Sequence, residues 1–136
     1  MKTLSLSAVL LAASCGGSLG YQISAGSASP VTDVFTCARE QLKVLDYDQS
    51  SIDVKERRIT ARRIDETIRR SDVTFRRGLN QLVVEVGIRS TGETGLTVEA
   101  STFYEYSTQR GYTLEQGPTT DAAKGAAQAI VEKCAQ

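Results

Sequence analysis

Two stretches of alternating side chains in the second half of the chain constrain its fold most strongly. Residues 82–89 place apolar side chains at every second position, and residues 96–107 repeat this alternation. A period of two is typical of a strand with one buried face. The residues between them include Gly92 and Gly95 and suit a hairpin loop. The sequence therefore predicts a pair of antiparallel strands at the centre of the fold.

The stretch before this pair allows two interpretations. Residues 58–64 fit an edge strand with a polar face, but Ile64 and Ile68 could also join them to a helix. We expect a strand near residues 57–64 with a loop after it. The other expected segments are a short strand near residues 46–48, a strand at 72–77 that pairs back onto 82–89, and a loop at 109–117.

Helical periodicity marks both ends of the domain. The first helix opens at residues 30–33, with Thr32 as its expected N-cap, and its apolar stripe consists of Phe35, Ala38, Leu42 and Leu45. The second opens at residues 118–121, and its apolar face consists of Ala123, Ala126, Ala127, Ile130 and Cys134. The predicted fold is a two-layer α+β sandwich in the order α-β-β-β-β-α, with both helices on one face of an antiparallel sheet.

The N-terminus has the pattern of an export signal. A single basic residue, Lys2, precedes an apolar run at residues 4–13 that is too short to span a bilayer, which takes about 20 residues. Cys15 follows small residues and resembles the cysteine of a bacterial lipobox, although Ala12 replaces the usual large aliphatic residue. The resemblance implies a fatty-acylated Cys15. Ordinary secretory cleavage without lipidation, or a cytosolic chain, is the alternative.

The lipobox resemblance also implies a domain plan and a location. Residues 1–14 would be a removed signal peptide, 15–31 the lipidated cysteine with a flexible Gly/Ser/Ala-rich tether, and 32–136 a single α+β domain. The mature protein would be lipid-anchored in the cell envelope. Because Gly16 is not acidic, the resemblance implies the periplasmic face of the outer membrane if the organism is Gram-negative.

If Cys15 takes lipid, Cys37 and Cys134 remain as an even pair in an oxidising compartment, and we expect them to form a disulfide. Two separate buried thiols are the alternative. The chain has no Cys-x-x-Cys motif and no histidine, so no redox or metal site is expected.

Short motifs at 35–38, 42–47 and 59–61, together with Cys134, are similar to small exported bacterial lipoprotein domains. This resemblance implies a fold and a cellular location but no activity.

Charge is balanced over the whole chain but not along it. Residues 55–77 hold nine basic and four acidic residues, a net charge of +5, and the remainder carries −5. Four Arg-Arg pairs within this segment are candidate anion-binding residues: Arg57, Arg58, Arg62, Arg63, Arg69, Arg70, Arg76 and Arg77. The partner would be an envelope protein, an anionic lipid or a glycan, and nucleic acid is not expected. A solvated edge balanced by the acidic remainder is the alternative.

Catalytic groups are scarce. Without histidine, neither a Ser-His nor a Cys-His nucleophile pair can form, and the neighbouring carboxylates at residues 46–48 and 65–66 fit turns and surface. No phosphate-binding glycine loop or EF-hand spacing is present, so no cofactor is expected. A second candidate surface is aromatic and consists of Phe103, Tyr104, Tyr106 and Tyr112, although such residues on strands are usually packing. We expect a non-catalytic, membrane-anchored protein that binds another envelope component.

Overall fold

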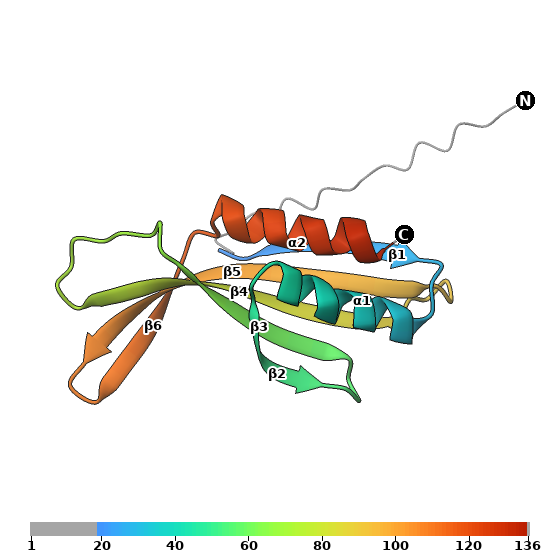
Figure 1. The fold of residues 1–136 in the computed structure, drawn as a ribbon, viewed down its shortest axis with the longest axis horizontal. Helices are drawn as coiled ribbons and strands as arrows, with labels where there is room; N and C mark the ends of the chain where they lie inside the picture. Colours follow the sequence, from blue (N-terminus) through green and yellow to red (C-terminus); the bar gives the residue numbers. More distant parts are fainter. Residues whose placement is uncertain (1–18, 136) are drawn as a thin grey trace, which may run out of the picture.

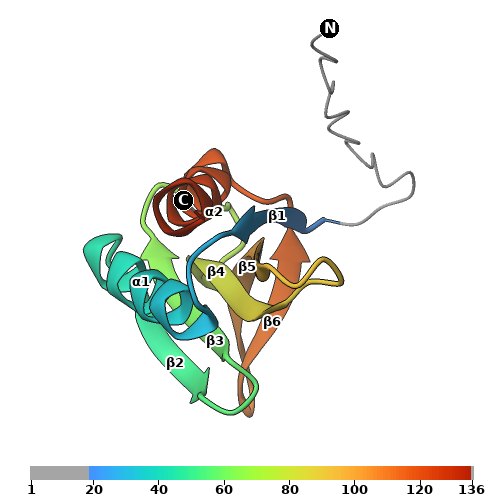
Figure 2. The same cartoon turned by 90° about the vertical axis from the view of Figure 1, so that its right-hand side faces the viewer.

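Six antiparallel strands form one sheet with two helices on one of its faces in the computed structural model, which describes residues 19–135 (Figures 1 and 2). The elements are β1 (Tyr21–Ser27), α1 (Val31–Val44), β2 (Asp48–Asp53), β3 (Arg58–Asp65), β4 (Phe75–Ile88), β5 (Thr94–Thr108), β6 (Gly111–Gly117) and α2 (Asp121–Cys134). The expected signal peptide and the lipidated Cys15 lie outside the described residues.

The two central strands divide the molecule into two regions. Strands β4 and β5 pair over almost their whole length, and β3 and then β2 continue the sheet beyond β4. The other edge of β5 is shared: β1 pairs with its first half and β6 with its second half. Both helices lie over the region where β1 pairs with β5, and we call this region the helix-covered half (Figure 1). We call residues 66–80 and 102–117, which extend beyond the helices, the outer lobe.

The α+β class and the packing of both helices on one face are confirmed, and the expected order α-β-β-β-β-α is present with two additional strands, β1 before α1 and β6 before α2. The expected tether is wrong over residues 21–27, which form strand β1 against Thr94–Ala100. Tyr21, Ile23 and Ala25 are partly buried against the core, and this alternation is short and lies among Gly and Ser. The strand is stabilised by the free edge of β5, a partner about 75 residues away that local periodicity does not reveal.

Two further expectations along the chain need correction. Residues 111–117 form strand β6 rather than part of a loop, and Gly111, at a φ of 134°, supplies the left-handed conformation for the hairpin turn before it. Residues 75–77 do not pair back onto 82–89, because β4 continues through residues 78–81 as one strand. The strand expected at 57–64 is confirmed as β3.

The hydrophobic core lies between the helices and the covered face of the sheet. Its largest fully buried apolar side chains are Val34, Leu42, Ile59, Leu82, Val84, Leu96, Val98 and Ile130. Burying a side chain of this size stabilises the fold by about 1.5–3 kcal/mol. Ala123 and Ala127 of α2 are also fully buried, and their small side chains let the helix pack close to β5.

Each helix end has its own local cause. Helix α1 begins after Pro30 without a side-chain cap, so the expected Thr32 cap is wrong. Its C-terminus forms a Schellman motif, in which Asp46 adopts a φ of 65° and the Tyr47 N–H donates to the Leu42 carbonyl at 2.9 Å. Helix α2 has a hydroxyl cap, since the Thr120 side chain accepts a hydrogen bond from the Ala123 N–H.

A buried polar network marks the boundary between the two regions. Asn80 of β4 donates to the Asp65 carboxylate at 3.0 Å, and its carbonyl oxygen accepts from the hydroxyls of Thr102 and Thr120 at 2.8 and 2.9 Å. The Thr102 hydroxyl also accepts from the Thr120 N–H. Three strands and the start of α2 are thereby joined by side chains whose hydrogen bonds are satisfied, which makes this junction specific as well as stable.

The predicted disulfide is confirmed and joins the two helices. Cys37 of α1 and Cys134 at the end of α2 are bonded with their Cα atoms 5.6 Å apart, across 97 positions of sequence. Cross-linking a loop of this length contributes about 4–5 kcal/mol in the chain-entropy model. Disulfides of this structural kind are typical of oxidising, exported compartments.

Candidate functional site

The outer lobe brings together two of the four predicted arginine pairs, Arg69-Arg70 and Arg76-Arg77, with the predicted aromatic residues. The loop after β3 folds back over the start of β4, where a Cβ on Gly78 would lie only 2.3 Å from the Ile68 side chain. On β6, a Cβ on Gly117 would lie 2.3 Å from the Tyr104 ring. Both glycines therefore permit close approaches that any side chain would block. They bring this loop and the Tyr104 ring close to the strands.

Aromatic rings line one face of the lobe. Phe75 lies edge-on to Tyr104 and to Tyr106, with ring centroids 6.4 and 5.8 Å apart. The Arg70 guanidinium lies over the Tyr104 ring, 4.6 Å from its centroid. Such edge contacts and cation–π contacts hold large, partly exposed side chains in place. Phe103, which also belongs to the predicted aromatic surface, alternates to the opposite face of β5, and Tyr112 is exposed on β6.

A buried carboxylate lies on the opposite face of the lobe. Glu105 of β5 is only 3% exposed, and its Oε1 atom lies 3.5 Å from Arg76 Nε and 3.2 Å from Arg77 Nε. Adjacent strand residues normally point to opposite faces, but a bulge between Phe75 and Arg77 lets both arginines reach the same carboxylate. Oε1 nevertheless accepts no hydrogen bond within the described residues.

The other four arginines of the predicted anion-binding set lie in or beside the helix-covered half and are engaged separately. Arg58 forms an ion pair with Glu85 at 2.7 Å, and Arg62 donates to Gln81. The remaining two donate to main-chain carbonyl oxygens: Arg57 to Val86 and Arg63 to Leu45. The segment 55–77 is thus divided between two regions, and only Arg69, Arg70, Arg76 and Arg77 belong to the outer lobe.

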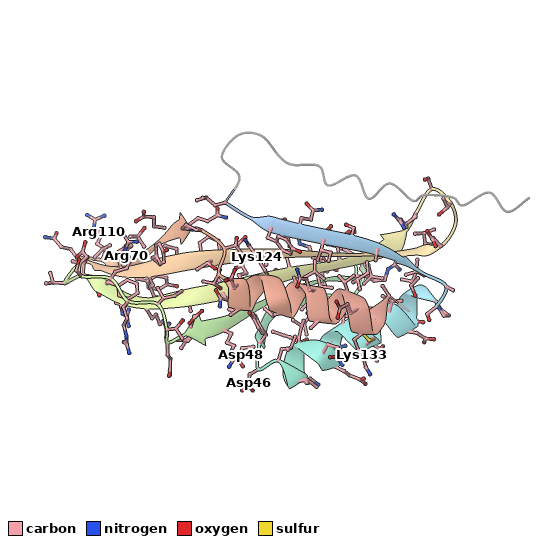
Figure 3. All side chains as sticks on the ribbon, turned by 90° about the horizontal axis from the view of Figure 1, so that it is seen from above. Asp46, Asp48, Arg70, Arg110, Lys124 and Lys133 are labelled. Carbon is pink, nitrogen blue, oxygen red and sulfur yellow. A yellow bond between two sulfur atoms is a disulfide. The ribbon has the colours of Figure 1, made fainter. Side chains whose placement is uncertain are left out.

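Sequence reasoning missed one basic residue of the lobe. Arg110 lies in the tight turn between β5 and β6, at the same end of the molecule as Arg70 (Figure 3). Its position follows from the hairpin, and the Arg-Gly step at residues 110–111 was the only local signal of that turn. The lobe therefore carries five arginines, which come from the loop after β3, from β4 and from the turn between β5 and β6.

A hollow lies where the C-terminus of α1 and the N-terminus of α2 meet β3. This cleft of about 620 Å³ is lined in part by Tyr47, Arg63, Asp65 and Asn80. Burial raises the pKa of Tyr47 above its ordinary value. Burial also raises the pKa of Asp65, but hydrogen bonds from Thr67 and Asn80 outweigh it, so this pKa lies below its ordinary value. These hydrogen bonds hold the Asp65 carboxylate in place and stabilise its ionised form.

The remaining acidic residues do not converge. Asp46 and Asp48 lie in and after the turn that ends α1, and both are exposed (Figure 3). Across residues 19–135, no three or more of the Cys, Asp and Glu side chains are grouped closely enough to hold a metal ion. The outer lobe is therefore the site with the strongest combination of charge, aromatic surface and buried polar structure.

Comparison with protein-family models and with curated proteins finds no match to this chain. Neither of the helices in the described part of the chain has the length and apolar character needed to cross a bilayer.

Proposed function

We propose that the protein is a non-catalytic, membrane-anchored binding domain of the cell envelope, and that its outer lobe holds another envelope component. The observation that carries this proposal is the gathering of five arginines and several aromatic rings in a region that neither helix covers (Figure 1). Arginine and tyrosine are among the residue types most enriched where binding energy is concentrated in interfaces.

The proposed anchor would hold this lobe close to the membrane. Strand β1 begins at Tyr21, six residues after Cys15, and six extended residues span about 20 Å at most. Tyr21 pairs with Ala100, and the neighbouring Leu19 carbonyl accepts a hydrogen bond from Thr119. The chain thus enters the domain where the outer lobe begins, not at the far end of the helix-covered half.

Mild crosslinking of intact envelopes tests the binding role. We compare Arg70→Ala/Tyr112→Ser in the lobe with Arg89→Ala/Ile88→Ser at the opposite end, because each pair removes one exposed arginine and one exposed apolar or aromatic side chain. The lobe variant should lose a reproducible co-purifying partner, whereas the control should keep it. Retention by the lobe variant together with loss by the control would contradict the proposal.

The intact mass of the membrane-fraction protein tests the anchor. A chain that starts at Cys15 and carries added acyl mass is the expected result, with two thiols appearing only after reduction. A chain without acyl mass would contradict the anchor and leave a secreted binding domain.

Direct binding of an anionic lipid or glycan is the second candidate function. It is favoured by Arg69 and Arg110 of the lobe, which have no side-chain partner among the described residues. Binding of this kind should weaken as salt rises, since the exposed charges are screened. The arginines of the helix-covered half, such as Arg58, should contribute little because they are already engaged.

A further inference from the structure

We propose that Arg76 and Arg77 form a binding site for a phosphate group and that the buried Glu105 carboxylate is its positioning residue. The inference rests on the proposed binding role of the outer lobe and names the chemistry of the bound group. Glu105 is 3% exposed, whereas the side chains of Arg76 and Arg77 are 49% and 45% exposed. The carboxylate therefore lies beneath two guanidinium groups that face solvent.

The contacts leave the outer donors of both arginines available. Each guanidinium approaches Glu105 Oε1 through Nε, and only Arg77 adds a long contact of 3.5 Å from Nη2 to Oε2. A guanidinium carries five N–H donors in a fixed fork, so most of them remain unused. The bulge at Arg76 and the buried carboxylate together fix where these forks point.

The charge around this position is not balanced by the carboxylate alone. One Glu105 faces two guanidinium groups, and Arg69 joins them at the lining of an adjacent hollow of about 290 Å³. Asp65 and Glu66 also line this hollow and carry negative charge, so the positive excess is confined to Arg76 and Arg77 with their single shared carboxylate, Glu105. The Glu105 Oε1 atom is held by these two ion pairs alone and accepts no hydrogen bond within the described residues.

Phosphate is the anion that this geometry suits. It presents several oxygens, so two or three guanidinium forks can bind it at the same time. The most accessible source is a lipid headgroup, because the short link from Cys15 to Tyr21 would place the start of the lobe within about 20 Å of the bilayer. Anionic headgroups attract each basic residue near the surface by about 1 kcal/mol.

Two substitutions with the same charge change separate positioning from simple attraction. Glu105→Gln and Glu115→Gln each remove one negative charge from the lobe, but Glu115 is exposed on β6. We measure binding of full-length Cys15→Ser protein to phosphatidylcholine vesicles with and without phosphatidylglycerol. Glu115→Gln should tighten binding by up to about fivefold, whereas Glu105→Gln should weaken it by about fivefold or more. A Glu105→Gln variant that binds tighter, as Glu115→Gln does, would overturn the positioning role.

A second variant keeps both positive charges but removes the planar guanidinium groups with their fixed set of N–H donors. Arg76→Lys/Arg77→Lys changes only exposed side chains, so the fold is expected to persist, which circular dichroism checks. Weaker binding by this variant supports recognition of the phosphate geometry, and unchanged binding overturns it. Glycerol phosphate as a soluble competitor distinguishes the sources: displacement indicates recognition of the isolated phosphate group, and persistent vesicle binding indicates a headgroup held in a bilayer.

Failure of this inference is distinguishable from failure of the proposed function. Wild-type protein that ignores phosphatidylglycerol vesicles but retains its crosslinked partner would overturn the phosphate site and leave the binding role intact. Loss of both results would overturn both proposals.

Discussion

The helix-covered half and the outer lobe are built from the same two strands but by different physical means. In the helix-covered half, β4 and β5 bury Leu82, Val84 and Val98 beneath two disulfide-linked helices. In the outer lobe the same strands carry partly exposed aromatic rings and a carboxylate between two arginines. The comparison shows that stability and the proposed binding surface are separated along a continuous sheet, so substitutions should affect one without the other.

Removing the disulfide should have the largest effect. Cys37→Ser/Cys134→Ser is expected to lower the free energy of unfolding by about 4–5 kcal/mol, because the unfolded chain regains the freedom of a long loop. Denaturant unfolding of the wild type with and without reductant, beside the double variant, measures this loss. Equal stability in all three samples would show that the staple does not hold the helix-covered half together.

Truncating a core leucine sharpens the contrast between the regions. Leu82→Ala removes a fully buried side chain beneath the helices and should cost about 2–5 kcal/mol. Leu114→Ala, on edge strand β6 of the lobe, removes a half-buried side chain and should cost less than about 1.5 kcal/mol. Similar losses measured by chemical denaturation would mean that the lobe has a core of comparable strength.

The boundary network should respond to pH. The pKa of Asp65 in the folded protein lies below 3.8, so its contribution to stability is present above that pH and is lost as the pH falls through the folded pKa. Asp65→Asn should therefore be less stable than the wild type at neutral pH, and the difference should shrink in acid. Asp48→Asn, at an exposed position on β2, is the matched control. A pH-independent difference for Asp65→Asn would contradict the assignment.

The smallest expected effect is a gain. Asp46 ends helix α1 in the left-handed region at a φ of 65°, a conformation that glycine adopts without steric cost. Asp46→Gly should raise the free energy of unfolding by about 0.5 kcal/mol and leave vesicle binding by the lobe unchanged. The same substitution at Asp48, which is in strand β2, should destabilise the protein by comparison.

Local patterns in the sequence predicted the elements that carry their own periodicity. The alternation at residues 82–88, the apolar stripe of α1 and the alanine face of α2 were sufficient to place the core and the class of fold. Strand β1 was missed because it is short and pairs with an edge of β5 that is far away in the sequence. Strand β6 was missed because it is short and pairs with β5 across a tight turn. Periodicity reports which residues are buried but not which strand provides the partner.

The candidate site was predicted only as two separate lists of residues, the arginine pairs and the tyrosines. The bulge that turns Arg76 toward Glu105 has no local sequence signature, and the approach of Arg70 to Tyr104 depends on how the loop of residues 66–74 folds back. Glu105 alternates along its strand like an ordinary surface residue, so its burial could not be anticipated.

The sequence by itself determined the α+β class, the two helices on one face and the pairing of Cys37 with Cys134. The elements followed from apolar periodicity, which is a local property of the sequence, and the disulfide followed by elimination from the number of cysteines. Only the tertiary structure decided which arginines meet. The pairing of β4 with β5 sets the bulge, and close approaches at Gly78 and Gly117 bring the loop and Tyr104 against the strands. Those contacts join residues distant in sequence, and their geometry follows from the packing of the whole sheet.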